Sequence, residues 1–214
     1  DEVAFIDIDA TTGNVPPNLK LIERIARECR SPISYGGGVK SLDQIENIVS
    51  IGVEKVIVSK SFFDSKGEIC KRASKKLGSQ SVVVCFDVRR SRFNKQRYHI
   101  YTSNGTCKES IDLSSALKLA EKCGVGEIII NSINQDGTRD GYDHTLAKLV
   151  YDTTNVPVII TGGASSFDEA IDLTKSYPGF AAAGSTIFML KGKFDAVLVQ
   201  YPEIQERKNL THRS

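Results

Sequence analysis

Short apolar runs alternate along the chain with longer stretches in which apolar residues recur every three or four positions. The short runs are rich in valine and isoleucine, as is typical of parallel strands that are buried on both faces. The longer stretches have the pattern of amphipathic helices. We therefore predict strands at 3–8, 33–35, 55–59, 81–88, 127–133, 158–161 and 180–183. Helices are predicted near 17–29, 41–51, 63–77, 111–123, 143–153 and 166–176.

This alternation of strands and helices predicts βαβ units and a parallel sheet. Residues 97–107 break the rhythm, and the pair Asn104-Gly105 within them favours a hairpin turn.

An internal repeat gives the strongest indication of the fold. When the chain is shifted by 125 residues, Gly37-Gly38 falls on Gly162-Gly163, and Phe63 falls on Phe188. One offset that holds without gaps over about sixty residues indicates two similar halves.

Seven parallel strands would leave two unpaired edges, which closure into a barrel removes. The sequence therefore predicts a (β/α)8 TIM barrel, with residues 1–214 as one domain that carries strands two to eight. The first βα unit of that barrel is expected to lie outside this chain. A doubly wound open sheet is the alternative fold, but it does not explain the repeat.

Composition narrows the class of protein. The net charge of +2 argues against a nucleic-acid partner, and no run approaches the length of about 20 apolar residues that spans a membrane. The five cysteines lack CxxC spacing and the three histidines are scattered, which favours reduced thiols in the cytoplasm and no metal site. The run Gly36-Gly37-Gly38 lacks G-x-G-x-x-G spacing, so no cofactor is predicted.

Glycine turns and hydroxyl-bearing loops follow several strands, at the end of the barrel where active sites lie. Backbone N–H groups at glycines, together with nearby hydroxyls, form cradles for phosphate. Because the pattern occurs in both halves, we predict two phosphate sites on opposite sides of the barrel mouth. The candidates are Gly38, Ser59 and Lys60 on one side, and Gly162, Gly163, Gly184 and Ser185 on the other.

Carboxylates gather at the same end of the predicted barrel. Asp7 and Asp9 follow the first run, Asp87 follows the apolar run 82–86, and Asp136 lies in the loop after the strand at 127–133. A carboxylate at the end of a buried strand needs a partner or a role, and the alternative for each is a loop-capping function. Asp87 is the best candidate for general acid–base chemistry, because a strand holds it rigidly.

Three charged residues mark the opposite end of the strands. Glu2, Lys55 and Glu127 each stand at the start of a predicted strand. From position alone, ion pairs that stabilise the fold are the expected role.

At these residues the chain resembles a known family. The segments YGGGVKSLDQIENIVSIGVEKV, GSQSVVVCFDVRR, GVGEIIINSINQDGTRDGYD and PVIITGGASS are similar to HisF, the ammonia-using cyclase subunit of imidazole glycerol phosphate synthase. The resemblance covers essentially the whole chain.

The resemblance implies a role for each group of residues. Asp87 would be the fifth-strand member of an acid–base pair whose first-strand partner lies outside the chain. Phosphate contacts would map to Gly38, Ser59 and Lys60 and to Asp136, Gly137, Gly163 and Ser185, and Asn134 would belong to the substrate pocket. Asp7 is a further candidate to face the substrate from its position at the end of the first strand alone. Glu2, Lys55 and Glu127 would form part of a gate for ammonia delivered by a docked HisH-type glutaminase, in place of stabilising ion pairs.

The departures from the family pattern leave alternatives open. Ser59-Lys60 stands where the family has Asn-Thr, and Asn134-Gln135 stands where it has Asp-Arg. Segments such as VGEIIINSI look closer to paralogues associated with surface-polysaccharide genes, which amidate a nucleotide-linked acetamido sugar. The resemblance thus implies the cyclase, this paralogue, or an inactive barrel that binds a phosphorylated ligand.

Overall fold

The computed structural model describes residues 2–92, 94, 97–191 and 196–197. Within them, seven parallel strands pair in a single order around a curved sheet, with β1 and β9 at its two edges. The strands, in that order, are β1 (Val3–Ile6), β2 (Ile33–Gly36), β3 (Lys55–Val58), β4 (Val82–Arg90), β7 (Glu127–Ser132), β8 (Val158–Thr161) and β9 (Phe180–Ala182).

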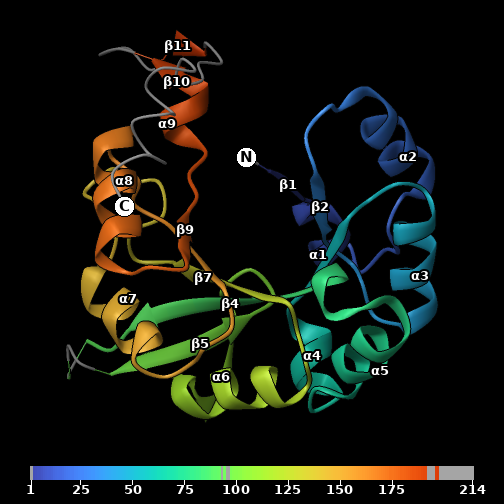
Figure 1. Cartoon of the computed structure of the whole chain (residues 1–214), viewed down its shortest axis with the longest axis horizontal. Coiled ribbons are helices and arrows are strands. Elements are labelled where there is room, and N and C mark those ends of the chain that lie inside the picture. The colour runs from blue at the N-terminus through green and yellow to red at the C-terminus, as the bar shows by residue number, and fades with distance from the viewer. Residues whose placement is uncertain (1, 93, 95–96, 192–195, 198–214) are drawn as a thin grey trace.

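Helices cover the outer, convex side of this sheet (Figure 1). The main ones are α2 (Leu19–Glu28), α3 (Leu42–Ser50), α5 (Glu68–Leu77), α6 (Leu113–Lys122), α7 (His144–Tyr151) and α8 (Phe167–Ser176). Shorter helices are α1 (Ile8–Thr12), α4 (Lys60–Asp64), the 3-10 turn η1 (Ser79–Ser81) and α9 (Thr186–Met189). The curved parallel sheet inside a layer of helices is the predicted (β/α) barrel architecture.

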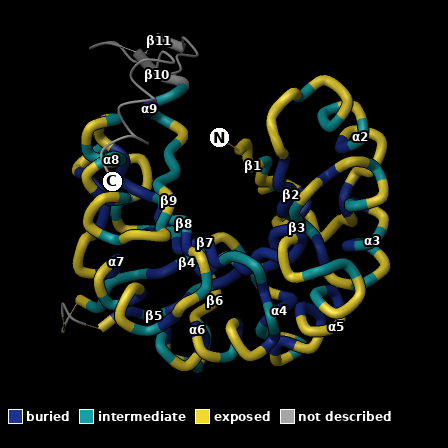
Figure 2. The backbone as a smooth tube through the Cα atoms, in the orientation of Figure 1, coloured by how far each residue is buried: buried dark blue, intermediate teal, exposed yellow. Residues whose placement is uncertain are grey.

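Side chains on the two faces of the sheet form two separate apolar clusters. The outer cluster lies between strands and helices and contains most of the core, including Phe62, Phe86 and Ile128. A small inner cluster of Ile57, Val83 and Ile129 packs inside the curve of the sheet. The burial follows the sheet and the inner sides of the helices (Figure 2). This alternation along each strand is what directs every second side chain towards the barrel interior.

A hairpin extends the sheet at its centre. β5 (Tyr98–Thr102) pairs antiparallel with the end of β4 and with β6 (Cys107–Asp112). The turn between them contains Ser103, Asn104 and Gly105 with φ values of 53°, 56° and 77°. The predicted hairpin is thereby confirmed, and its second strand runs further than expected, to Asp112.

The predicted strands and main helices agree with the structure to within two residues, except that the helix expected at 63–77 is divided. The strand expected at 3–8 ends at Ile6, because the Asp7 carboxylate accepts a hydrogen bond from the Ala10 N–H at 2.8 Å and begins α1. The helix expected at 63–77 is two helices, because Lys66 and Gly67 adopt φ values of 52° and 84° between them. A short pair, β10 (Leu190–Lys191) and β11 (Ala196–Val197), was not predicted.

No helix in the described ranges is both long enough and apolar enough to cross a membrane. The single-domain prediction extends over residues 1, 93, 95–96, 192–195 and 198–214, which lie outside the described residues, and it stays a prediction.

Candidate active site

Asp87 lies on the inner face of the central strand. It follows Val83 and Cys85 at alternate positions of β4, and both of these belong to the inner apolar cluster. Across the sheet it stands opposite Asn131 of β7, whose Nδ2 donates a hydrogen bond to the carboxylate at 2.9 Å. The carboxylate is half-buried. Asp87 therefore points into the barrel and not towards the helices.

The surroundings of Asp87 favour its protonated form. Burial raises the pKa of its carboxyl, and the negative charge of Asp136 raises it further, while the hydrogen bond from Asn131 acts in the opposite direction. The pKa is raised on balance. A carboxyl with a raised pKa can both donate and accept a proton closer to neutral pH, which suits general acid–base chemistry.

The second glycine turn packs tightly among three loops. The Gly163 carbonyl accepts a hydrogen bond from the Gly141 N–H at 2.8 Å, and a Cβ at Gly163 would lie 2.1 Å from the Gly141 oxygen. A Cβ at Gly184 would lie 2.8 Å from the Cβ of Ala164. The loops after β7, β8 and β9 are thus in contact, which brings Gly162 and Gly163 close to the loop of Gly184 and Ser185.

The first glycine turn is equally confined. A Cβ at Gly37 would lie 2.4 Å from the Asp7 oxygen, and one at Gly38 would lie 2.5 Å from the Val15 oxygen. Ser59 follows β3 directly and precedes α4, and its hydroxyl is buried without a hydrogen-bond partner in the described part of the chain. A buried hydroxyl without a partner is costly, so a ligand oxygen would find a ready donor here. Lys60 is exposed and bonds Asp64 at 3.0 Å.

The sheet order places these two turns symmetrically about Asp87. β2 lies two strands from β4 on one side, and β8 lies two strands from β4 on the other. With neighbouring strands about 4.8 Å apart, each glycine turn is roughly 10 Å along the sheet from Asp87. The geometry is compatible with a substrate that carries an anionic group at each end and reacts between them.

Other predicted site residues are engaged in local structure. Asp7 accepts hydrogen bonds from the Ala10 N–H and, at 3.2 Å, from the Tyr35 hydroxyl, which is the loop-capping alternative. Asn134 accepts a hydrogen bond from the Arg90 N–H at 2.8 Å and so joins its loop to β4.

In the same loop, the Asp136 N–H donates to the Ser132 carbonyl at 3.0 Å. Gly137 has a φ of 75°, and a Cβ atom added at this residue would have no neighbouring atom within 4 Å. Their proposed contacts with substrate stay predictions.

Two side chains at the mouth were not singled out from the sequence. Asn131 is the hydrogen-bond donor to Asp87, and Arg89 stacks over the ring of Tyr101 at 4.5 Å from its centroid. Asn131 is a polar interruption in the apolar run of β7 at the same parity as Ile129, which was the signal available. Arg89 follows Asp87 by two residues, so strand alternation alone places it on the same face.

An ion-pair cluster closes the opposite end of the barrel interior. Lys55 Nζ lies 2.8 Å from Glu2 and 3.0 Å from Glu127, and the side chains of Lys55 and Glu127 are 19% and 18% exposed. Burial lowers the pKa of Lys55, but its hydrogen bonds to Glu2 and Glu127 outweigh this and raise the pKa overall. Burial raises the pKa of Glu127, against the effect of Lys55. The structure brings the three residues predicted here together.

The inner apolar cluster lies between this ion-pair cluster and Asp87. Ile57 follows Lys55 on β3, and Ile129 stands between Glu127 and Asn131 on β7. Asn131 stands four steps along β7 from Glu127, which corresponds to about 13 Å. The described residues contain no group of three His, Cys, Asp or Glu side chains that could hold a metal ion.

Comparison with known proteins decides the family. The family profile for histidine biosynthesis proteins matches residues 1–195. A protein of Vibrio vulnificus, named "Putative imidazole glycerol phosphate synthase subunit hisF3", is 39% identical over 208 residues, which cover 97% of this chain and 79% of that protein. The chain belongs to the HisF family.

Further members of the HisF family show the same extent of similarity. A protein of Leptospira borgpetersenii that is named as a HisF subunit of the same kind is 40% identical over 98% of this chain and 82% of its own length. The imidazole glycerol phosphate synthase subunit HisF of Sulfolobus acidocaldarius is 34% identical over 86% of this chain and 72% of its own length. The resemblance seen in the sequence motifs is confirmed, and with it the barrel fold.

Proposed function

We propose that this chain is the cyclase subunit of an imidazole glycerol phosphate synthase. It would use ammonia to convert a ribulosyl aminoimidazole carboxamide bisphosphate into imidazole glycerol phosphate and an aminoimidazole carboxamide ribotide. The observation that carries the proposal is the inward-facing carboxyl of Asp87, with its raised pKa, midway between two glycine turns. The names of the relatives support the same assignment.

The residues of the chain divide the work as follows. The turns at Gly38 and Gly163, with Ser59 and Ser185, hold the two phosphates through N–H and hydroxyl donors. Holding both ends fixes the reacting centre over the middle of the sheet, which lowers the entropic barrier of ring closure. Asp87 accepts a proton from the reacting nitrogen or returns one as the ring closes.

Ammonia would enter from the opposite end of the barrel. A HisH-type glutaminase would dock there in the cytoplasm and release ammonia beside Glu2, Lys55 and Glu127. Lys55 would have to leave its two carboxylate partners for a small molecule to pass, so these residues would act as a gate. Beyond them, Ile57, Val83 and Ile129 would line an apolar path to Asp87.

A paralogous amidotransferase is the second candidate. It is favoured by Asn134-Gln135 and Ser59-Lys60, which depart from the family pattern at the mouth while the ion-pair cluster is kept. Two of the relatives with 39% identity carry the copy names hisF3 and hisF2, although two Leptospira relatives named HisF share 39–40% and further relatives named HisF share 31–34%. In that case the substrate would be an acetamido sugar linked to a nucleotide, and the ammonia path would be the same.

Turnover of the purified protein with ammonium salt and each candidate substrate tests the proposal. We expect Asp87→Asn to lower the turnover of the bisphosphate by about 10²- to 10⁴-fold, as for loss of a general acid or base. Asp172→Asn on the exposed side of α8 is the matched control and should retain full activity. Unchanged activity of Asp87→Asn would reject its role, and turnover of the sugar alone would establish the paralogue.

A further inference from the structure

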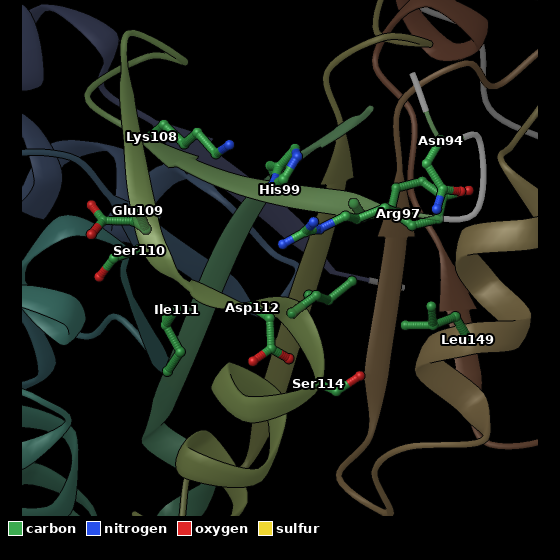
Figure 3. A pocket seen from close by; sticks show the side chains of 12 residues that line it. Asn94, Arg97, His99, Lys108, Glu109, Ser110, Ile111, Asp112, Ser114 and Leu149 are labelled. Carbon is green, nitrogen blue, oxygen red and sulfur yellow. The ribbon is translucent and has the colours of Figure 1, made fainter. Parts of the chain in front are cut away.

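A second cavity lies outside the candidate active site, between the hairpin and the helices. Its volume is about 580 Å³, and it is bounded by β5 and β6 on one side and by α6 and α7 on the other (Figure 3). It shares no lining residue with the candidate active site. We call it the hairpin pocket. It is lined by Asn94, by residues 97–99 and 108–112, and by Leu113, Ser114 and Leu149.

Three basic side chains converge on the hairpin pocket. Arg97 directly precedes β5, His99 is its second residue, and Lys108 comes from β6 (Figure 3). Arg97 and Lys108 are exposed. Partial burial lowers the pKa of His99, and the positive charges of Lys108 and Arg97 lower it further. The imidazole therefore lies within electrostatic reach of both cations.

The carboxylates of the pocket are already committed elsewhere. Asp112 caps α6, accepting hydrogen bonds from the Ser115 N–H at 3.0 Å and the Ser115 hydroxyl at 2.6 Å. Glu109 accepts a hydrogen bond from the Thr102 hydroxyl at 2.7 Å. In the ranges that the structure describes, neither Arg97 nor Lys108 has an ion-pair partner. Two cations and an imidazole thus face the cavity, and the carboxylates of Glu109 and Asp112, which keep their charges, are held by hydroxyl and N–H donors and not by these cations.

The rest of the lining is apolar or carries hydroxyl groups. Ile111, Leu113 and Leu149 supply aliphatic surface from β6, α6 and α7, and Ser110 and Ser114 add hydroxyls. An inorganic ion would use only the basic side chains. A ligand with both an anionic group and an apolar ring would use the aliphatic surface as well.

We propose that the hairpin pocket binds a small organic phosphate, with the phosphate between Arg97, His99 and Lys108 and the apolar portion against Leu113 and Leu149. This proposal is independent of the cyclase assignment, because no residue is shared with it. A bound phosphate stabilises the imidazolium form of His99, so the pKa of His99 rises on binding.

The charged groups around His99 set the sign of this effect. Arg89 stands opposite it on β4, Asp112 stands opposite it on β6, and Arg97 and Lys108 flank it. The residues that α6 and α7 contribute to the pocket, Leu113, Ser114 and Leu149, carry no charge. The net electrostatic potential at the imidazole is therefore positive, and a bound anion would reduce it.

Titration of the His99 imidazole by NMR, with phenyl phosphate as the probe, tests the proposal. The chain has three histidines, so a His99→Gln variant assigns the signal. We expect saturating phenyl phosphate to raise the pKa of His99 by about half a unit or more, and inorganic phosphate to bind at least about threefold more weakly. The double variant Arg97→Gln, Lys108→Gln should bind the probe at this site about tenfold or more weakly.

The controls separate this site from the glycine turns. Lys118→Gln, an exposed change on α6 outside the pocket, should leave the titration of His99 as in the wild type. We expect phosphate at the glycine turns to leave the His99 signal unchanged, because these turns follow β2 and β8 and contribute no residue to the hairpin pocket. Failure of the cyclase assignment would therefore leave this result intact. An unmoved His99 pKa, equal binding by the double variant, or equal affinity for inorganic phosphate would each overturn the proposal. All of the substituted side chains are exposed or half-buried, and circular dichroism checks that the variants fold.

Discussion

Asp87 differs from the other carboxylates of the mouth in what surrounds it. The carboxylate of Asp7 accepts hydrogen bonds from the Ala10 N–H and the Tyr35 hydroxyl, whereas in the described part of the chain Asp87 receives one side-chain hydrogen bond, from Asn131. Burial raises the pKa of Asp87, and Asn131 limits that rise. The chemistry available to this carboxyl therefore depends on one amide from the neighbouring strand.

Replacing that amide should raise the pKa of Asp87 further. In Asn131→Ala the carboxylate loses the donor that stabilises its charged form, while burial and the charge of Asp136 remain. The Asp87 carboxyl should then titrate at higher pH. As the pH falls, a reaction that needs its ionised form should therefore begin to lose activity at a higher pH than in the wild type. A ¹³C NMR titration of the carboxyl carbon measures the change, with the exposed Asn155→Ala as control. A pKa that stays the same or falls would contradict this account.

The sequence predicted Asp87 but not its partner, for a physical reason. A lone carboxylate at the end of an apolar strand is visible in one segment, because burial of a charge is costly. Asn131 matters only through its register with Asp87, and that register depends on how β4 and β7 pair. Asp7 was expected to face the substrate because the strand was expected to continue past Ile6.

At the scale of elements, the loops after the strands are held by packing between backbones. Gly163 has a φ of 95°, and a side chain there would collide with the Gly141 carbonyl that lies beside it. Gly179 has a similar φ of 88°, but a Cβ atom added there would have no neighbouring atom within 4 Å. The two glycines thus share a backbone conformation and differ in their neighbours.

This pair gives a matched test of the tight contact. Gly179→Ala should lower the free energy of unfolding by about 1–2 kcal/mol, the cost of the left-handed conformation. Gly163→Ala should lower it by at least about 1 kcal/mol more, because the loop after β7 has to move away. Urea denaturation of both variants provides the comparison. Equal losses of unfolding free energy in the two variants would show that the loop after β7 can move away from residue 163 without destabilising the protein.

A network of polar side chains joins the hairpin to α7. The Arg90 guanidinium lies 2.7 Å from the Asp143 carboxylate, and the Tyr98 hydroxyl donates to the same group at 3.0 Å. Asp143 also caps α7 by accepting a hydrogen bond from the Leu146 N–H at 3.0 Å. The turn signal at Asn104-Gly105 predicted the hairpin, and the hydrophobic pattern predicted α7 separately. It could not show that they are tied, because each partner of the network lies in a different segment.

At the scale of the molecule, the barrel interior has an ion-pair cluster at one end and a candidate catalytic carboxyl at the other. The ion-pair cluster around Lys55 lies at one end, the carboxyl of Asp87 lies at the other, and apolar side chains separate them. The repeat and the parallel strands predicted this barrel, because two similar halves and unpaired edges point to closure. The ion pairs of Lys55 with Glu2 and Glu127 could be expected only because all three residues stand at the starts of their strands.

Lys55→Met should uncouple the two ends if the proposed gate operates. Turnover driven by glutamine through the partner subunit should fall about tenfold or more, because ammonia would no longer be admitted in a controlled way. Turnover driven by ammonium salt should stay within about twofold, because Asp87 and the glycine turns are untouched. Assays of both reactions with the same preparation measure the ratio.

The control for this change removes an ion pair that has no place in the barrel interior. Lys76→Met breaks the contact with Glu46 on the outer helices and should leave the ratio of the two rates as in the wild type. Equal loss of both activities in Lys55→Met would count against the gate and leave a purely structural ion pair.

Glu127, Ile129 and Asn131 occupy alternate positions of a single strand, with the acid at one end and the amide at the other. Because side chains along a strand change sides at every step, inserting or deleting one residue between them would turn one end of β7 outward. A change of two residues would keep both ends facing inward and alter only the distance between them. Along this strand, the evolution of the two ends is therefore constrained to length changes in even steps.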